Sequence, residues 1–517
     1  MTGNPFKVGL VVPLFCPTHE FSDMVVEYLG FGYIASYLRQ FGVSVEIIEP
    51  FVERLSIEEV AERISHGKFD FLGFTLMSSD YFRGMRSILD QLSGADLENV
   101  HINVGGYYAT FFRDQILQRE ARVHSLTLGE GERTIKELIE RLKENASIKD
   151  VAGLLYRRED GIVLSSGDRR LMSAEELNEL PFPARDHIDI ILQRKGRIQV
   201  NSSRGCFGQC TFCAVHSYYD QQQGMKWRGR SAENVVQEIE HLVTTYGVKY
   251  IHFSDEEFVG PGIRGQERAR QIAQLLLDKN LHIKFSLYCR ADSVDPETFQ
   301  LLAQAGLESI FLGVEFGVQS TLNDYRKGIT VDQIKKALSI LNGLKIRINV
   351  GFMMFEPLST VESFRENMKF CIEHTKFTLR RVISRMAIYP YSVAYHRLKP
   401  VIDMDEELSF DDMFGDHYPY RFQDQRVEFL YHLLTQSLKV ISPSIKYLEI
   451  RKTPSPQRRE QLLARWSYEV YSLIDSISAE IQHEPDLTDA SLQAYIQKFN
   501  NQLTAWDADG SLVSLTS

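Results

Sequence analysis

The sequence lacks a long apolar run, a signal-peptide pattern and an excess of basic residues. No stretch of about eighteen consecutive apolar residues occurs in the 517-residue chain, so we expect no membrane span. The first residues, MTGNPFK, lack the charged and then apolar segments of a signal peptide. A net charge of −11 speaks against a general nucleic-acid binder, and we expect no nucleic-acid partner. The 44% hydrophobic content is ordinary for a globular chain of about two to four domains.

Cysteine is also scarce, with six residues in the whole chain. Three of them lie in one short stretch, whereas Cys16, Cys289 and Cys371 are far apart, which is unlike a disulfide framework. Free thiols predict a reducing compartment, so we expect a cytoplasmic protein. The Cys289 thiol could donate a hydrogen atom in catalysis, although a lone cysteine is more often a small packing residue. Both interpretations of Cys289 stay open.

The stretch NSSRGCFGQCTFC, from Asn201 to Cys213, dominates what is present. It separates Cys206 from Cys210 by three residues and Cys210 from Cys213 by two, so one loop can direct three thiolates at a cluster of irons. Three ligands on a four-iron cluster leave one iron free for a cofactor. We call residues 206–213 the cysteine loop.

The neighbours of the cysteine loop suit thiolates but leave a second interpretation. Arg204 supplies a cation, and Gly205 lets the backbone pass close to a cluster. The alternative is a zinc site with His216 as fourth ligand, although zinc sites more often combine two paired cysteine elements. Metal analysis separates the two.

Residues 1–150 alternate β-rich apolar runs with amphipathic helical patterns. Five such units predict an α/β domain with a doubly wound parallel sheet in the flavodoxin-like order. The expected strands are 7–13, 43–48, 69–75, 101–105 and 125–128, and the expected helices lie near 30–41, 56–66, 82–93, 111–121 and 132–144.

Ligands of a doubly wound sheet bind at the carboxyl ends of its strands. Those ends carry small, polar or Gly-rich segments at 13–23, 76–79, 105–107 and 129–131, which suit a large flat ligand. A nicotinamide domain would place G-x-G-x-x-G directly after the first strand, where this chain has PLFCP. We therefore set a nicotinamide cofactor aside.

A connection and a second series of βα units follow. Residues 151–196 predict a hairpin around Asp160-Gly161 and then an extended linker, because each proline of LPFPARD disfavours helix at the residue before it. Residues 197–395 predict a partial (β/α)6 barrel. Its expected strands are 198–203, 250–254, 284–288, 309–315, 346–354 and 382–389, with helices at 231–246, 264–279, 295–305, 330–343 and 359–374.

Polar residues collect at the carboxyl ends of these barrel strands, where barrel chemistry belongs. An acidic residue is more often a surface group, but Glu315 lies in an apolar strand, where unpaired burial would be costly. After the cysteine loop, the residues at the strand ends are Asp255-Glu256-Glu257, Cys289-Arg290, Glu315, Met354-Phe355-Glu356 and Tyr389-Pro390.

Two parts of the chain resemble a known family. The cysteine loop resembles the radical S-adenosylmethionine (SAM) signature CxxxCxxC, with the aromatic Phe212 before the last cysteine. Residues 1–150 resemble the cobalamin-binding domain that precedes the barrel in class B radical SAM methyltransferases and their relatives. The matching segments are LGFGYIASYL at 29–38, VGGYYAT at 104–110 and LGEGE at 128–132. The resemblance covers residues 10–395.

The resemblance implies three cofactors, namely a [4Fe–4S] cluster, SAM and cobalamin. It assigns the cluster to Cys206, Cys210 and Cys213. It assigns SAM contacts to Phe212, Asp255, Glu256, Arg290, Glu315, Arg326 and Tyr389. It assigns cobalamin contacts to Thr75, Leu76, Met77, Ser78, Ser79, Gly105, Gly106, Tyr107, Gly129, Glu130 and Gly131.

The chain departs from the family pattern in two places. The D-x-H-x-x-G motif that supplies a lower histidine ligand is absent after the first strand, where the only imidazole is His19, and Tyr108 stands where relatives often carry histidine. We therefore expect cobalamin bound without a histidine ligand, and a vestigial domain that binds nothing is the alternative. At 389–392 the chain reads YPYS instead of the family's P-G-T turn.

Residues 396–517 predict a helical region, with helices at 423–441, 456–482 and 488–504, that sets substrate choice. No second cysteine cluster occurs there, so the auxiliary-cluster domains of some relatives are absent. Methylthiotransfer is disfavoured because the N-terminal domain contains only Cys16 and cannot hold a second cluster.

The resemblance implies a cobalamin-dependent radical SAM methyltransferase that acts on an unactivated carbon of a small-molecule or peptide substrate. In that route a reduced cluster cleaves SAM, the resulting radical activates the substrate, and methylcobalamin donates the methyl group. An electron donor such as flavodoxin or ferredoxin would reduce the cluster. The alternatives are a non-methylating radical reaction, such as epimerisation, oxidation, ring contraction or cyclisation, and an Fe–S electron-transfer or sensor protein that never cleaves SAM.

Overall fold

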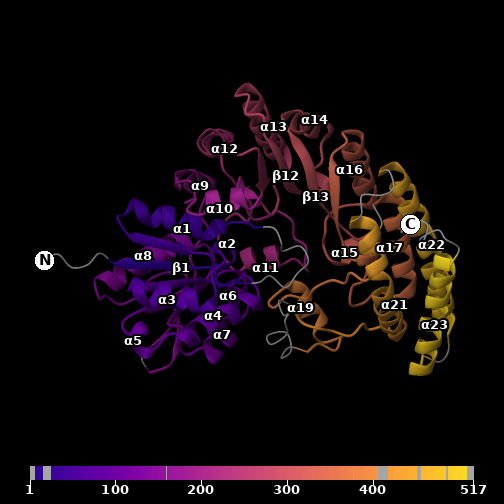
Figure 1. Cartoon of the computed structure of the whole chain (residues 1–517), viewed down its shortest axis with the longest axis horizontal. Helices are drawn as coiled ribbons and strands as arrows, with labels where there is room; N and C mark the ends of the chain where they lie inside the picture. Colours follow the sequence, from indigo (N-terminus) through magenta and orange to yellow (C-terminus); the bar gives the residue numbers. More distant parts are fainter. Residues whose placement is uncertain are drawn as a thin grey trace.

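The computed structural model describes residues 6–15, 25–158, 160–375, 378–405, 417–450, 456–484 and 487–508. Within its helices, side chains are described except at 379–380, 438–450, 456–466 and 503–508. Figure 1 shows the N-terminal sheet at one end of the molecule and the last helices at the other. Most of the expected ligand segment at 13–23, with Cys16 and His19, lies outside the described residues.

The first sheet has seven strands in the order β2-β1-β3-β4-β5-β6-β7. β1 to β5 run parallel, which confirms the flavodoxin-like order. The expected hairpin supplies β6 and β7, which extend the sheet antiparallel to β5. The strands are β1 Lys7–Val11, β2 Ser44–Ile48, β3 Phe71–Thr75, β4 His101–Gly105, β5 Ser125–Thr127, β6 Leu154–Arg157 and β7 Val163–Ser165.

Helices cover both faces of this sheet. One apolar core contains Leu10 of the sheet and Leu138 of α8, and a separate core contains Leu72 of the sheet and Met85 of α4. Two buried faces explain why the parallel strands read as nearly continuous apolar runs. The helices are α1 Leu29–Gln40, α2 Pro50–Glu53, α3 Ile57–Gly67, α4 Ser79–Gln91, α5 Gly94–Leu97, α6 Tyr107–Phe111, α7 Arg113–Arg119 and α8 Gly131–Lys143.

The second sheet is fully parallel, in the order β14-β13-β12-β11-β8, and one apolar core spans the sheet and its helices. Its strands are β8 Ile198–Val200, β11 Tyr250–Phe253, β12 Lys284–Arg290, β13 Leu307–Glu315 and β14 Arg347–Phe352, and β9 Ser203–Arg204 pairs separately with β10 Arg228–Gly229. The helices are α11 Ala214–Asp220, α12 Ala232–Tyr246, α13 Gly262–Asp278, α14 Pro296–Ala305, α15 Gln319–Asp324, α16 Val331–Gly343 and α17 Val361–His374, with the 3-10 turn η1 Ala291–Ser293. The α/β fold class is confirmed, and five of the six strands expected for the partial barrel form one parallel sheet.

The sixth expected strand, 382–389, differs from the prediction. The chain there forms α18 Leu379–Val382 and then a single parallel bridge between Phe355 and Arg385. Met386 and Ile388 are fully buried, so the apolar pattern reflects burial without continuous strand pairing.

The C-terminal region is helical, as expected, with α19 Val393–Leu398, α21 Gln425–Ile450, α22 Pro456–His483 and α23 Asp489–Ala508. α22 packs on α17, where Arg365 Nε lies 2.8 Å from Asp475 Oδ1. Figure 1 shows α22 and α23 on the side of the second sheet away from the N-terminal strands. Among the described helices none is both long and apolar enough to cross a membrane.

The connection between the two sheets is clamped by buried charges. It carries α9 Ala174–Glu179 and α10 Ile188–Gln193. Arg185 pairs with Glu27 of the N-terminal part and, at 2.7 Å, with Glu238 of α12, and all three side chains are buried. Buried ions of this kind are tolerated only when they are paired, so the connection fixes the two sheets against each other.

His187 forms the next clamp. Its Nδ1 lies 2.8 Å from Glu49 Oε2 and its Nε2 lies 3.2 Å from Glu53 Oε1. Burial alone lowers the pKa of His187, but the two carboxylates outweigh it and raise the pKa to about 9. The imidazolium is therefore part of this contact at neutral pH.

This raised pKa predicts a pH-dependent stability. The pKa of His187 in the folded protein, about 9, lies above the unfolded value near 6.5. Protonated His187 therefore stabilises the fold fully below about pH 6.5, and this stabilisation is lost as pH rises through 9. We expect the free energy of unfolding of the wild type to exceed that of His187→Gln by about 2 kcal/mol at pH 6.5 and by much less at pH 9.5. The gap between the two melting temperatures measures this, and a gap that does not narrow contradicts it.

Candidate functional site

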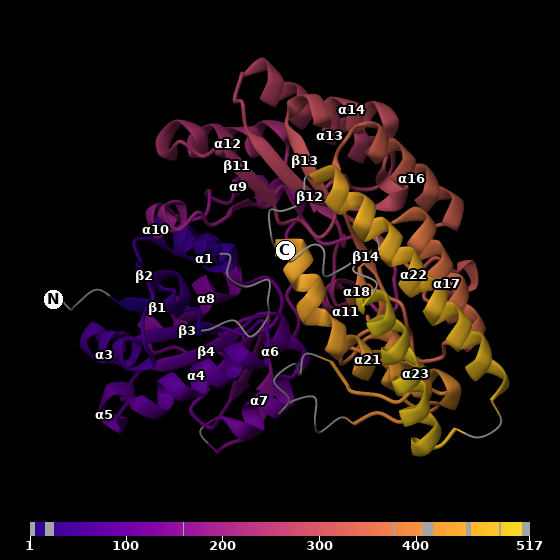
Figure 2. The same cartoon turned by 45° about the vertical axis from the view of Figure 1, so that its right-hand side comes forward.

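The cysteine loop leaves the ribbon of β9 and β10 through a fixed glycine. Gly205 has φ +81°, and a Cβ on it would lie 1.8 Å from the backbone oxygen of Lys226. No other residue fits this turn without moving backbone. Cys206 follows directly, and Cys213 caps the N-terminus of α11. In both views α11 lies between the two sheets (Figures 1 and 2).

Each cysteine of the loop has an N–H group beside it. The backbone N–H of Gly208 donates to Cys206 Sγ at 3.3 Å, and Arg290 Nη1 lies 3.7 Å from Cys210 Sγ. Burial raises the pKa of the Cys206 thiol to about 12 and that of Cys213 to about 11, so metal binding must displace these protons. Donors aimed at all three sulfurs, including the first amides of α11 at Cys213, suit thiolate ligands and fit a cluster. Among the described residues, no three Cys, His, Asp or Glu side chains are arranged for a single metal ion.

Arg290, at the end of β12, is held rigidly beside the loop. Its guanidinium makes a two-pronged contact with Asp292, at 2.9 and 3.0 Å, and donates to the backbone oxygen of Lys327 at 2.8 Å. A fork of this kind fixes the plane of the guanidinium. Its remaining nitrogen faces Cys210, so Arg290 places a positive charge near the sulfurs.

Glu315 ends β13 in a strained conformation. Its φ is +70°, in a region that residues with a side chain rarely adopt, and the pairing with β14 is irregular there. The carboxylate Oε1 accepts from Lys327 Nζ at 2.9 Å, and the ammonium is almost fully buried. Strained residues held by ion pairs cluster at functional sites, so the geometry supports the selection of Glu315.

The turn after α15 places two neighbouring basic residues in different surroundings. Arg326 is exposed on the surface, whereas its neighbour Lys327 is buried against Glu315. Burial lowers the pKa of Lys327, but the Glu315 carboxylate and the Cys210 sulfur together raise it by more, so the side chain stays charged. Lys327 is therefore a further candidate in this turn, and a contact of Arg326 with SAM stays a prediction.

The acidic residues after β11 differ in their surroundings. Asp255 is completely buried and accepts from the Ser202 backbone N–H at 3.2 Å, the Ser202 hydroxyl at 2.8 Å and the Ser203 hydroxyl. Its carboxylate braces the start of the cysteine loop. Glu256 is half-buried and accepts from the Gly205 backbone N–H at 3.0 Å and from the Tyr107 hydroxyl at 2.9 Å. Glu256 therefore joins the two parts of the molecule.

Glu257 is the third member of this acidic group. It is fully buried, its Oε2 accepts from the Gly260 backbone N–H, and its Oε1 has no hydrogen-bond partner among the described residues. Burial raises the pKa of Glu257 to about 7. The nearby Cys289 thiol is also buried, donates to the Arg290 backbone oxygen at 3.0 Å and has a pKa well above its usual value because of burial. The structure thus encloses Cys289, and its catalytic role stays a prediction.

Two aromatic residues selected from the sequence lie on different sides of the loop. Phe212 packs edge-on against Phe316 and Tyr325, with ring centroids 6.3 and 6.0 Å away, which supports the loop from the barrel side. Tyr389 stacks on Phe111 of α6, at 6.5 Å, and so contacts the N-terminal domain. Contacts of either ring with SAM stay predictions.

The strand ends of the N-terminal sheet form a close backbone junction. Gly106 has φ +101°, and a Cβ there would lie 2.5 Å from the Leu76 oxygen, so this glycine is required by the fold itself. A Cβ on Gly105 would make ordinary van der Waals contact with Thr127, at 3.6 Å from its backbone oxygen, so a small side chain fits there. The buried Thr75 hydroxyl beside Gly106 has no hydrogen-bond partner among the described residues. An unsatisfied buried hydroxyl fits a bound cofactor at this end.

The remaining expected cobalamin residues are largely occupied by other contacts. Glu130 accepts from Arg228 Nη1 at 2.7 Å and from the Met172 backbone N–H at 2.8 Å, and Gly129 packs on the Gln222 side chain. The Met77 sulfur accepts from the Tyr28 hydroxyl at 3.5 Å. Gly129-Glu130-Gly131 thus joins the two sheets in this structure, and a cobalamin contact there stays a prediction.

No histidine of the described part of the N-terminal domain lies at the ligand end of its sheet. His101 begins β4 and His124 precedes β5, which places both at the amino ends of the strands, and His66 is exposed on α3. The described part of the domain therefore offers no imidazole to a cobalt at the strand ends.

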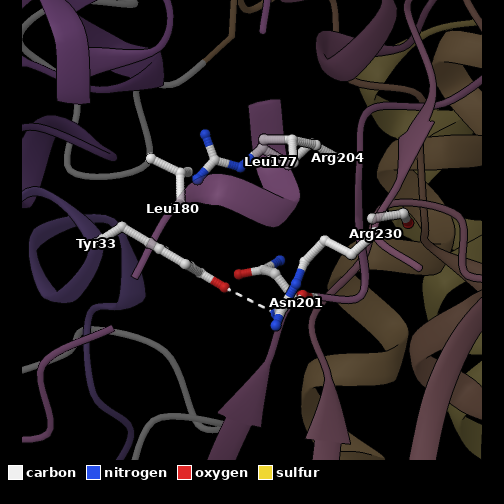
Figure 3. A pocket seen from close by; sticks show the side chains of 7 residues that line it. Tyr33, Leu177, Leu180, Asn201, Arg204 and Arg230 are labelled. Atoms are coloured by element: carbon white, nitrogen blue, oxygen red, sulfur yellow. Dashed lines mark hydrogen bonds between the residues drawn. The ribbon is translucent and has the colours of Figure 1, made fainter. Parts of the chain in front are cut away.

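A small crevice lies behind the cysteine loop and has room for about one water molecule. It is lined by polar groups such as Asn201, Arg204 and Arg230 and closed by Leu177 and Leu180. Figure 3 shows the Tyr33 hydroxyl pointing at Arg230, whose Nη1 donates to it at 3.2 Å. The crevice belongs to the junction between the sheets.

Sequence reasoning missed three groups that the structure brings to the site. Lys327, Glu132 and Asp292 each pair with a residue beside the cysteine loop, namely Glu315, Arg204 and Arg290. Asp292 could have been found from its position two residues after Arg290, but Glu132 pairs across 72 positions and carries no local signal.

Family models match two segments of the chain. Residues 22–139 match the B12 binding domain, and residues 200–371 match the Radical SAM superfamily. The two matches contain the strand-end loops of the first sheet and the cysteine loop, respectively.

Curated relatives are similar over most of the chain. An uncharacterized methyltransferase of Pyrococcus horikoshii is 27% identical over 403 residues, which cover 76% of this chain and 84% of the relative. The 4'-phospho-dehydrooxetanocin synthase of Priestia megaterium is 29% identical, over 68% of this chain and 49% of the relative. The anaerobic magnesium-protoporphyrin IX monomethyl ester cyclase of Rubrivivax gelatinosus is 25% identical, over 65% of this chain and 60% of the relative.

Solved structures share the fold. The cobalamin-dependent S-adenosylmethionine radical enzyme OxsB, with aqua-cobalamin bound, superposes with a TM-score of 0.80 at 21% identity and covers 98% of this chain and 81% of its own. The radical S-adenosylmethionine methyltransferase TsrM of Kitasatospora setae superposes with a TM-score of 0.62 at 16% identity, with 77% of each chain covered.

The cysteine loop predicts a specific metal content. Anaerobically reconstituted protein should hold about four irons per chain, and replacing Cys206, Cys210 and Cys213 together by Ala should remove nearly all of them. Cys371→Ala, in the buried face of α17, is the matched control and should keep its iron. Iron and zinc analysis with visible absorbance checks this. Stoichiometric zinc in the native protein would overturn the cluster.

Proposed function

Because the chain belongs to the family of radical SAM enzymes that carry a B12 binding domain, we propose that it is a cobalamin-dependent methyltransferase acting on an unactivated carbon. One observation supports this proposal more strongly than the others do. The strand-end loop proposed to hold cobalamin touches the residues beside the cysteine loop, through Tyr107 and Glu256. Chemistry that uses both cofactors on one substrate needs such neighbouring sites.

The proposal gives each cofactor its residues. Cys206, Cys210 and Cys213 hold the cluster, while Glu315 with Lys327 and the half-buried Glu256 orient SAM. Gly105, Gly106 and Thr75 form the floor for cobalamin. When bound, the cluster with SAM supplies hydrogen abstraction, and cobalamin supplies the methyl group.

The remaining residues prepare the environment. Arg290 offsets negative charge at the sulfurs, and the buried Glu257 and Cys289 keep water away from that side of the cluster. Asp255 acts by holding Ser202 and Ser203 in place. A small-molecule or peptide substrate and a flavodoxin or ferredoxin as electron donor complete the proposal.

A second candidate is a radical reaction without methyl transfer. It is favoured by the relatives named as a dehydrooxetanocin synthase and as monomethyl ester cyclases. SAM labelled in its methyl group separates the candidates when it is incubated with reduced protein and cobalamin. A methyltransferase should move label to cobalamin and release S-adenosylhomocysteine, a non-methylating enzyme should release only 5′-deoxyadenosine, and an electron-transfer protein should release neither.

The adjacent residues Arg326 and Lys327 give a sharp test of the SAM site. Lys327→Met should reduce 5′-deoxyadenosine formation about tenfold or more, because it removes a buried charge that pairs with Glu315. The exposed Arg326→Ala is the control and should stay within about twofold of wild type. Chromatography of the released 5′-deoxyadenosine measures the activity of both variants, and iron analysis checks that both keep the cluster. Equal losses in the two variants would contradict the assignment.

Gly105 gives the matching test for cobalamin. Gly105→Leu should abolish hydroxocobalamin uptake while iron content and melting temperature stay near those of wild type, because its Cβ fits against Thr127 and the rest of the side chain extends into the proposed cofactor site. Gly105→Ala should retain the cofactor, whereas Gly106→Ala should lose stability because its Cβ meets Leu76. Gel filtration with visible absorbance reads the uptake. Nitrogen splitting from a histidine in the Co(II) resonance spectrum would contradict the histidine-free assignment.

A further inference from the structure

Two residues of the N-terminal domain reach the base of the cysteine loop from different strand ends. We propose that Tyr107 and Glu132 are positioning residues that fix the first cluster ligand, Cys206, by acting through Glu256 and Arg204. The inference rests on the proposed role of the three loop cysteines as cluster ligands. It means that the cobalamin-binding half of the molecule helps to set the geometry of the cluster.

The first contact runs through Glu256. Its Oε1 accepts from the Tyr107 hydroxyl at 2.9 Å and, more weakly, from the Tyr219 hydroxyl at 3.5 Å. Its Oε2 accepts from the Gly205 backbone N–H at 3.0 Å. One carboxylate is therefore shared between the loop after β4 and the residue that precedes Cys206. Loss of the Tyr107 hydroxyl would leave Oε1 with only the long contact.

Gly205 transmits this contact because it cannot adjust. Its positive φ and its packing on the Lys226 backbone oxygen admit one local conformation. The Gly205 N–H lies in the planar peptide unit that joins Arg204 to Gly205, so its bond to Glu256 fixes the position of the Gly205 Cα. Because Gly205 admits one conformation, the Cys206 backbone continues from that point in a fixed direction. The bond thus orients the first ligand.

The second contact reaches the other neighbour, Arg204. Its Nη2 lies 2.6 Å from Glu132 Oε1 at the start of α8, and Glu132 is only 4% exposed. Its Nη1 lies 3.3 Å from Glu130 Oε1, and its guanidinium stacks on the Tyr33 ring. These three side-chain partners belong to the N-terminal domain, so that domain holds the guanidinium of Arg204.

The other ligands are anchored on the second sheet. Cys210 faces Arg290 of β12, and the backbone N–H of the following Thr211 donates to the Tyr325 oxygen at 3.0 Å. The Thr211 oxygen in turn accepts from the Ala394 N–H at 2.9 Å. A shift between the two domains would therefore move Cys206 relative to Cys210. Thiolate placement is one of the factors that tune such clusters.

The experiment uses the full reconstituted holoprotein and four single variants. Tyr107→Phe and Glu132→Gln remove one polar contact each and keep the shape of the side chain. Tyr37→Phe, which packs on Phe41, and Glu140→Gln, which pairs with Lys136 on the exposed side of α8, are the matched controls. Iron content, the paramagnetic resonance spectrum of the reduced cluster with and without SAM, and the SAM dissociation constant are measured for each.

Tyr107→Phe and Glu132→Gln should retain iron but shift the resonance spectrum of the reduced cluster, and they should weaken SAM binding about tenfold. The two controls should match wild type in both readouts. In a Glu256→Ala background, which removes the acceptor, Tyr107→Phe should have no further effect, because the hydroxyl acts through that carboxylate. A merely structural role would lower the melting temperature without moving the spectrum.

Two outcomes overturn the inference, and neither is confused with failure of the proposed function. Wild-type spectra in Tyr107→Phe and Glu132→Gln would show that the N-terminal domain does not position the ligand. Additive effects of Tyr107→Phe and Glu256→Ala would contradict the link through the carboxylate. Failure of the proposed function shows up earlier, as a wild-type protein without a cluster signal.

Discussion

Buried charges that must be paired across two sheets are the constraint on which the rest of this structure depends. Glu132 and Glu27 lie on the N-terminal side, and their cations, Arg204 and Arg185, lie beyond it. An unpaired buried carboxylate or guanidinium is strongly destabilising, so the two sheets have one acceptable relative placement. That placement brings the carboxyl ends of both sets of parallel strands together, and the site lies where these ends meet.

Local patterns were sufficient for most of the fold. The period of the apolar residues and the length of each unit predicted the five parallel strands of the first sheet, and their order followed from the rules for doubly wound sheets. The addition of β6 and β7 to that sheet could not be predicted, because antiparallel pairing at an edge leaves no mark on periodicity. The strand expected at 382–389 was wrong for a related reason, since burial of Met386 and Ile388 mimics a strand pattern.

The candidate site was predictable in residue type and poorly predictable in orientation. The spacing of the cysteines and the position of Glu315 at a strand end are local features, and both were found. The choice between Arg326 and Lys327 depends on the positive φ of Arg326, which turns the chain and directs its neighbour inward. Asp255 was selected for its charge, but its carboxylate accepts hydrogen bonds from two serine hydroxyls that only the folded chain brings to it.

Strain and charge burial support each other at the end of β13. The left-handed conformation of Glu315 costs on the order of 1–3 kcal/mol, and burying the Lys327 ammonium without a partner would cost several more. The 2.9 Å contact between the two side chains offsets both costs, and neither residue would be stable in its place alone. Gly313 makes the arrangement possible, because a Cβ there would lie about 3 Å from both charged groups. The pair is therefore set by folding before any cofactor arrives, which is the kind of preorganisation that catalysis at a charged cofactor requires.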